Sequence, residues 1–473
     1  FAVYKLNKLT AVVMRHFLTL LYFHPLHINS FMLDKLFGWG KKKEAPVLRV
    51  QPAIRFGRYS DNNKTVEKTQ RWTDADNLFK EKKFHESILS FFDYLRDDAL
   101  QNVTAVRKGD VIEFEFLQGS KIIRGSCNHN TVQAEVALVR MPQASVPVMR
   151  RLLEQNFNLY YSRYALHNDQ LCMRFDSTVE SANPNKLYYS FKELATRADK
   201  QDDLLVQDFS ALQTTDTSHI EEIPETEKEI KYRYMLQWID ETLKLIEPLD
   251  AEKLSGGIAH LLLNLAYRID YLIVPEGKLL YDLEDIVARY FAKDEKPVPE
   301  KNKAMITAFK AFLQKTKEDV FPSLFRSRHT FAITVPQTQK TIADTIYGAN
   351  QNMIWYRDNQ YPKIAQQVSE YGLGYCQYNF SIPKPITELY HILMMVNYSS
   401  FFKELGYSAE LYNAATGTFN NQLLQERIQT IMDEWRKKYP QISFKTENLR
   451  YDSLLSFTHS FTSEVEFVNT EAK

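Results

Sequence analysis

Strict alternation of apolar and polar residues marks the clearest pattern in the chain. In VIEFEF, residues 111–116, the apolar side chains Ile112, Phe114 and Phe116 alternate with two glutamates. This period of two predicts a strand with one buried face and one wet face. After the turn LQGS, residues 121–127 return as its hairpin partner, and TVQAEVALVR alternates in the same way to give a third strand.

Helical patterns and a second hairpin surround these strands. Apolar residues recur at helical spacing over 71–95, and a second helix is predicted over 147–157, which opens near a proline. Residues 159–166 and 171–177 predict a second hairpin around the turn HNDQ, and residues 188–209 a closing helix. Two hairpins with interleaved helices predict an α+β fold, an antiparallel sheet with helices on one face.

This order of elements defines a domain over residues 71–209. With QNV and a strand pair after the entering helix, and the final helix KELATRADK, the order resembles the YbjN family, which shares the fold of the type III secretion chaperones. The resemblance covers about residues 70–210. It implies a non-enzymatic, chaperone-like module of the bacterial cytoplasm, with a homodimer as a possible state. Such a module holds a protein or peptide client through apolar pockets and strand pairing at a sheet edge.

The second half of the chain has a different pattern. An acidic, Thr- and Ser-rich segment, residues 210–228, predicts an exposed linker. Residues 229–473 then predict a mainly α-helical domain, which the charged segment 293–303 could divide. A possible small sheet pairs residues 329–336 with 376–383. Helices are predicted at 230–249, 256–274, 278–292, 305–321, 337–357, 361–373, 385–404 and 422–438.

The N-terminal stretch decides the expected compartment. Residues 10–23 form an apolar run of fourteen residues interrupted by Arg15, too short for the roughly 20 residues that span a membrane. No small-residue cleavage site follows it. We interpret residues 1–31 as a non-native upstream extension and Met32 as the start of a cytoplasmic chain; a cryptic signal or anchor and a genuine extension are the alternatives. Residues 32–70 then supply an N-terminal helix and an extended arm.

Composition and motif content argue against nucleic-acid binding, membrane binding and the common motif-bearing enzyme classes. Lys plus Arg equals Asp plus Glu, 59 each, so no global field draws the chain to nucleic acid or an anionic membrane. The three cysteines, Cys127, Cys172 and Cys376, lie far apart, with neither a disulfide framework nor metal-ligand spacing. We expect them to be buried. The sequence carries no P-loop, HExxH, GxSxG or kinase motif, and we assign no cofactor, metal or catalytic residue.

Two short stretches carry candidate binding chemistry. RFGRYSDNN holds Arg55, Arg58 and Tyr59, which fit either a partner-binding arm or a turn whose Asp and Asn bond their own backbone. RSRH, residues 326–329, could hold an anion or be a solvated loop.

Two hypotheses about function follow from these patterns. In the first, a client binds to the α+β domain at an exposed apolar patch or open sheet edge beside helix 71–95 or beside the strand with Ile112, Phe114 and Phe116. In the second, the chain is an enzyme of unknown reaction, whose residues meet only in the folded C-terminal half. A stripe of His260, Asn264 and Arg268 on one helix is either part of such a site or a hydrogen-bonded edge within the core. The candidates for the enzyme site are His260, Arg268, Glu388 and His391.

Overall fold

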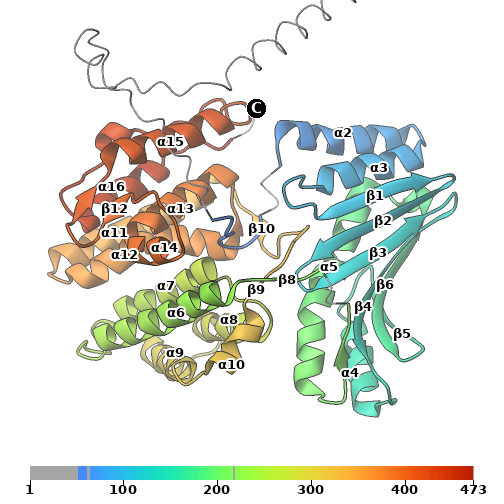
Figure 1. Cartoon of the computed structure of the whole chain (residues 1–473), viewed down its shortest axis with the longest axis horizontal. Coiled ribbons are helices and arrows are strands. Elements are labelled where there is room, and N and C mark those ends of the chain that lie inside the picture. Colours follow the sequence, from blue (N-terminus) through green and yellow to red (C-terminus); the bar gives the residue numbers. More distant parts are fainter. Residues whose placement is uncertain (1–51, 61–63, 217–218, 472–473) are drawn as a thin grey trace, which may run out of the picture. The chain divides into compact units, whose positions relative to one another are not determined.

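The computed structural model describes residues 52–60, 64–216 and 219–471. Within these residues, seven strands form one sheet in the order β1-β2-β3-β4-β6-β5, and β7 pairs with β4 (Figure 1). Every neighbouring pair in this sheet is antiparallel. The strands are β1 (Val103–Lys108), β2 (Val111–Gln118), β3 (Lys121–Cys127), β4 (Thr131–Arg140), β5 (Arg163–His167), β6 (Gln170–Thr178) and β7 (Gln213–Thr214).

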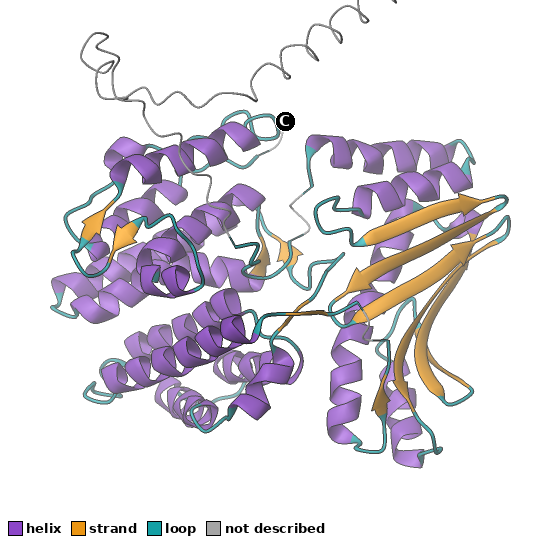
Figure 2. Cartoon of the chain, viewed as in Figure 1, coloured by secondary structure: helices purple, strands orange, loops and turns teal. Residues whose placement is uncertain are grey.

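Helices cover one face of this sheet, as predicted (Figure 2). Phe114 of β2 packs against Phe92 and Phe191, which belong to two different helices, with ring centroids 4.4 and 5.5 Å away. The opposite face is exposed to solvent and carries cross-strand ion pairs, among them Arg124–Glu115 at 3.0 Å. The α+β class is therefore confirmed. The helices of this domain are α2 (Val66–Lys80), α3 (Phe84–Leu95), α4 (Val146–Asn156), α5 (Pro184–Asp208) and the 3₁₀ turn η2 (Val179–Ser181).

Two local predictions in this domain were wrong. The single helix predicted over 71–95 is the hairpin α2–α3, which reverses at Lys82 with a φ of 61°. The strand β1 was not predicted at all. Its apolar pattern is weak because Val103 is the only fully buried residue of the strand.

The C-terminal half is mainly helical, as predicted, and builds one hydrophobic core. Helix α7 is buried along most of its length, which explains why its sequence is apolar nearly all round. Residues on both sides of 293–303 join the same core, so this segment does not divide the half. The helices are α6 (Glu225–Ile246), α7 (Ser255–Ile273), α8 (Gly277–Phe291), α9 (Val298–Phe312), α10 (Lys317–Val320), η3 (Phe321–Ser323), α11 (Gln339–Asp358), α12 (Pro362–Asn379), α13 (Lys384–Asn397), α14 (Ser399–Glu404), α15 (Asn421–Trp435), η4 (Thr446–Asn448) and α16 (Leu454–Val465).

Short strand pairs complete this half. The predicted pairing of 329–336 with 376–383 exists as two residues on each side, β10 (Val335–Pro336) parallel to β11 (Phe380–Ser381). The predicted linker also contains structure: it contributes β7 and β8 (Glu221–Glu222), and β8 pairs with β9 (Phe325–Arg326). The remaining pair is β12 (Tyr412–Asn413) with β13 (Thr418–Phe419).

The predictions for residues 1–31 and for the helix after Met32 lie outside the described residues. None of the helices in the described ranges combines the length and apolar character that crossing a bilayer requires. Cys127, Cys172 and Cys376 are free and buried, as expected.

Candidate functional site

The predicted client-binding residues of β2 lie inside the domain. Ile112 and Phe116 are fully buried and Phe114 is 4% exposed, because α3 and α5 pack over this face. This corrects the expectation that they border an exposed apolar patch. The alternation was interpreted correctly as a buried face, but the helices that cover it are the domain's own.

The arm that carries RFGRYS binds the chain's own helical half. Arg58 donates from Nε and Nη2 to Asp270 of α7 at 2.7–3.0 Å, and its guanidinium lies 4.0 Å from the ring centroid of Tyr378. The backbone N–H of Gly57 donates to the carbonyl of Tyr271 at 2.9 Å. Arg58 therefore has an intramolecular partner, which corrects its assignment to a partner-binding surface. Tyr59 is partly buried in the same arm, and Arg55 is exposed.

The polar stripe on α7 is a buried structural network. Glu370, 2% exposed, accepts hydrogen bonds from Asn264 at 2.6 Å and from Arg268 at 3.0 Å. Tyr398 and Asn397 donate to the same carboxylate at 2.6 and 2.7 Å. Glu370 thus receives four donors and compensates the buried guanidinium. The interpretation of this stripe as a hydrogen-bonded edge within the core is confirmed for Asn264 and Arg268.

His260 sits apart from this network. Burial lowers the pKa of its ring to about 4, and Nδ1 has no hydrogen-bond partner among the described residues. The ring packs edge-on against Tyr371 at 4.8 Å. His260 is therefore a neutral core residue in aromatic surroundings.

The other two enzyme candidates line a large cavity. A cavity of about 830 Å³ is bounded by the arm, by one face each of α13 and α15, and by the segment 325–329. His391 lies in its wall; burial first, and the charges of Arg427 and Lys384 second, lower the pKa of this ring to about 4. Its Nδ1 lies 3.3 Å from the hydroxyl of Tyr271. The structure therefore brings Glu388 and His391 together and separates them from the core residues His260 and Arg268.

The basic cluster RSRH is neutralised by the chain itself. Arg326 pairs with Glu227 at 2.8 Å, Arg328 with Glu221 at 3.5 Å, and His329 with Glu276 at 3.7 Å. Each of the three basic groups in this stretch thus has a carboxylate partner.

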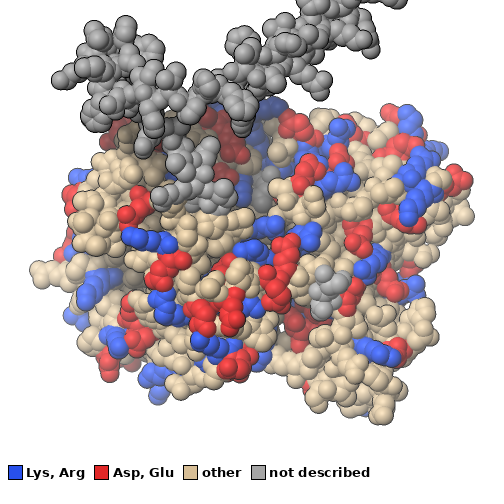
Figure 3. Space-filling view, viewed as in Figure 1, with Lys and Arg blue, Asp and Glu red and all other residues tan. Residues whose placement is uncertain are grey.

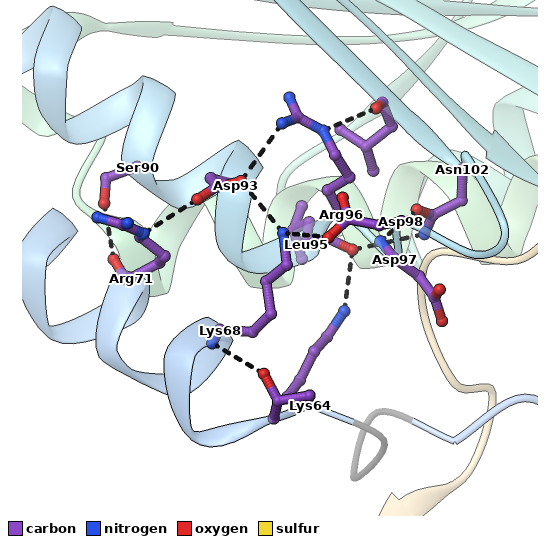
Figure 4. Close-up of polar contacts among 12 residues, drawn as sticks. Lys64, Lys68, Arg71, Ser90, Asp93, Leu95, Arg96, Asp97, Asp98 and Asn102 are labelled. Atoms are coloured by element: carbon purple, nitrogen blue, oxygen red, sulfur yellow. Dashed lines mark hydrogen bonds and ion pairs between the residues drawn. The ribbon is translucent and has the colours of Figure 1, made fainter. Parts of the chain in front are cut away.

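Charges also balance locally in the α2–α3 hairpin (Figure 4). Asp93 of α3 accepts from Lys68 at 3.2 Å, from Arg71 at 3.0 Å and from Arg96 at 3.3 Å. Ser90 donates to the carbonyl of Arg71 at 2.9 Å and fastens the two helices further. The polar cluster is therefore a clamp between two helices.

An exposed apolar surface lies on helix α4, and not beside Ile112, Phe114 and Phe116 as predicted. Val146, Leu153 and Phe157 are 75%, 61% and 92% exposed, and with the partly buried Met149 they line a surface hollow of about 390 Å³. The spacing 146, 149, 153, 157 places these side chains on one side of the helix. The inner side is formed by other residues, including Leu152. The sequence contained this signal, because the predicted helix 147–157 carries apolar residues on two faces.

The face of the molecule seen in Figure 3 mixes acidic and basic side chains and shows no large region of one sign. Among the described side chains, no group of three His, Cys, Asp or Glu residues could hold a metal ion. Comparison of the sequence with models of known protein families found no match, and no curated protein matches the chain. These comparisons neither support nor refute the resemblance to the YbjN family, which stays a prediction.

Proposed function

We propose that the protein is a non-enzymatic, chaperone-like interaction protein that binds client segments through its α+β domain. The observation that carries this proposal is the exposed apolar face of α4, defined by Val146, Met149, Leu153 and Phe157. Apolar surfaces of this kind, rimmed by polar residues, are typical of interaction sites. Arg150 and Glu154 supply the polar rim.

The size of the face favours a short client segment over a second copy of the chain. Helix α4 has 11 residues and is about 16 Å long, and a helix is about 10 Å wide. A stable dimer buries roughly 800 Å² per partner, which this face alone does not reach. An amphipathic helix with apolar residues at helical spacing fits the hollow and would bind reversibly.

The edge strands are poorer sites for a client. The backbone N–H of Tyr164 in β5 donates to Asn156 at the end of α4 at 2.9 Å, so the helix occupies part of that edge. The opposite edge strand β1 ends in Arg107 and Lys108, and charged residues of this kind discourage strand addition. A cytoplasmic location is part of the proposal, supported by three free cysteines and balanced charge.

The test uses a designed probe rather than an unidentified partner. A fluorescent 14-residue amphipathic peptide, with Leu and Phe at positions i, i+3, i+7 and i+11, is titrated with the full chain and followed by anisotropy. We expect micromolar binding, which Leu153→Asp and Phe157→Asp each weaken by about tenfold or more, because a charge then replaces a buried apolar contact. Phe467→Asp changes another aromatic residue that is 73% exposed and is the matched control.

Equal binding of a shuffled peptide with the same composition would contradict the proposal, as would unchanged binding by both α4 variants. Sedimentation of the wild type and of Phe157→Asp tests whether a second copy of the chain binds to the α4 face instead of a client. A dimer that the substitution converts to a monomer would show that a second copy covers this face, and would refute client binding there.

A further inference from the structure

The 830 Å³ cavity has a size typical of small-molecule sites, and its walls combine rings with charges. Phe56 and Tyr271 contribute apolar rings, and Trp435 contributes an indole whose Nε1 donates to Glu388 at 2.9 Å. Such walls accommodate the planar body of an organic molecule.

Arg427 of α15 is a cation of the cavity wall that forms no ion pair with a described carboxylate. The guanidinium is partly buried, and within the described ranges its polar contact is from Nη1 to the sulfur of Met395 at 3.2 Å. Burial lowers its pKa, Tyr407 opposes the shift, and no carboxylate in the described ranges offsets the lost hydration. Arginines removed from water are usually paired, so a guanidinium without an anion at a cavity wall is suited to receive one.

Lys384 adds a second positive charge to the same cavity. It begins α13 and forms neither an ion pair nor a hydrogen bond with any described residue. Its charge and that of Arg427 both act on His391, which lies between them along α13: Lys384 begins this helix, and Arg427 contacts Met395 near its end. Elsewhere in the wall, Lys231 and Arg326 share the single carboxylate of Glu227, at 3.2 and 2.8 Å. These two side chains therefore already have an anionic partner.

Glu388 and Glu434 are carboxylates of the wall on the same helices, α13 and α15, as Lys384 and Arg427. Glu388 accepts a hydrogen bond from the Trp435 indole. Burial raises the pKa of Glu388, and the charge of Lys384 and this hydrogen bond oppose the rise. Glu434 is exposed at the rim. Neither forms an ion pair with Lys384 or Arg427 within 4.0 Å.

We propose that this cavity binds a small organic anion, with a carboxylate or phosphate group held by Arg427, a planar apolar body against the aromatic wall, and Lys384 adding positive charge to the cavity. His391, neutral and fixed through Nδ1 by Tyr271, supplies its Nε2 as a neutral polar group beside the two cations. A guanidinium offers two parallel N–H groups to either oxyanion, and the lysine adds a mobile point charge. This site is independent of the α4 face and lies on other elements.

The experiment uses three probes of one shape on the full chain at 50 mM salt. Phenyl phosphate and benzoate carry the two candidate headgroups, and benzyl alcohol carries none. Calorimetric titration is expected to show at least tenfold tighter binding of one or both anions than of the alcohol. The stronger anion identifies the headgroup.

Substitutions decide whether the binding occurs at this site. Arg427→Gln is expected to weaken anion binding by about tenfold. Arg427→Lys should weaken it by less, because it keeps the charge, and Lys384→Gln should weaken it by about threefold, because it removes a more distant charge. Arg450→Gln removes an exposed arginine outside the cavity and should leave binding unchanged. Phe157→Asp should also leave it unchanged, which separates this site from client binding.

Anions that bind no more tightly than benzyl alcohol would overturn the proposal. Equal binding by wild type and Arg427→Gln would do the same, as would an equal loss in Arg450→Gln. Circular dichroism and thermal unfolding confirm that each variant is folded, and Lys384→Gln provides the test if Arg427→Gln is not.

Discussion

At the residue scale, Arg58 attaches the arm through ion pairs with residues far from it in sequence, Asp270 at 2.7 Å and Glu284 at 3.2 Å. Arg58 and Asp270 are separated by 212 positions, and Asp270 is 4% exposed. Burial raises the pKa of Asp270, and the charge of Arg58 opposes that rise. Nothing in RFGRYSDNN identifies this partner, so the sequence could supply the residue type but not its contact. The interpretation as a partner-binding arm failed for Arg58 because the partner belongs to the same chain.

Removal of Arg58 should therefore be costly. Arg58→Met is expected to lower the free energy of unfolding by about 3–5 kcal/mol, because it leaves a buried carboxylate unpaired. The loss should be larger at pH 8 than at pH 5, since the pKa of Asp270 rises further without Arg58 and ionisation then opposes folding. Urea unfolding of the wild type and of Arg58→Met at pH 5 and pH 8 measures this loss of unfolding free energy.

Two further variants separate the ion pair from general damage. The double variant Arg58→Met with Asp270→Leu should recover part of the loss, because neither charge then remains buried. Arg71→Met removes a surface arginine that is 52% exposed and should cost less than about 1 kcal/mol. Equal losses of unfolding free energy in Arg58→Met and Arg71→Met would show that the buried ion pair stabilises the fold no more than a surface ion pair does.

At the element scale, the reversal between α2 and α3 shows what apolar periodicity cannot reveal. The N–H of Lys82 donates to the carbonyl of Phe79 and that of Lys83 to the carbonyl of Leu78, both at 2.9 Å. These are the two bonds of a Schellman motif, which ends a helix with a left-handed residue. Glycine usually occupies that position, but here it is Lys82, within a charged run that fits a continuous helix.

Lys82→Gly should therefore stabilise the protein by about 0.5–1 kcal/mol. The left-handed conformation costs a residue with a Cβ roughly 1–2 kcal/mol, and the flexibility of glycine in the unfolded chain offsets part of that gain. Lys80→Gly, two residues earlier and inside α2, should instead destabilise by a similar amount. Thermal unfolding of both variants measures the difference. A loss of stability in Lys82→Gly would contradict the assignment of strain to this residue.

Prediction succeeded where one face of an element is buried and failed where a distant segment completes a surface. Strand β3 and strand β4 have the predicted bounds, because their alternation reflects the core directly. Residues 329–336 alternate too, yet only two of them form a strand. Phe331 instead enters the core of the α+β domain, where its ring lies 5.8 Å from Phe116. The α4 face could have been predicted from the apolar residues on two sides of one helix. The cavity could not be predicted, because its walls come from several segments that are far apart in the sequence.

At the scale of the whole molecule, the segment around Phe331 fastens the helical half to the sheet. The side chain of Gln118 at the end of β2 accepts from the N–H groups of Thr330 and Phe331 at 3.2 and 3.0 Å. Asn102 donates to the hydroxyl of Thr330 at 3.2 Å. These bonds satisfy buried polar groups of both halves, so the two cores should unfold together.

Buried acids gather beside this attachment and make it sensitive to pH. Asp199 of α5 accepts from the N–H of Ser120 at 2.8 Å and is surrounded by His329, Asp202 and Glu276. Burial first, and then the charges of Asp202 and Glu276, raise its pKa to about 7, although His329 opposes them. Burial would lower the pKa of His329, but the hydrogen bond to Glu276 and the charges of Glu276 and Asp199 raise it overall.

The sign of the pH dependence follows from proton binding. Between about pH 4 and pH 7 the folded chain keeps a proton on Asp199 that the unfolded chain has lost, so stability falls as the pH rises through this window. Asp199→Asn cannot ionise, and its amide oxygen can still accept from Ser120. The variant should match the wild type near pH 4 and be more stable at pH 8, by on the order of 1–4 kcal/mol.

Denaturant unfolding between pH 4 and pH 8 measures how the free energy of unfolding of the wild type and of Asp199→Asn changes with pH. Asp208→Asn, an exposed acid at the end of the same helix, should keep the wild-type slope. Parallel curves for wild type and Asp199→Asn would show that this carboxyl ionises in the folded chain as freely as in water, and that the attachment is not a source of the pH dependence.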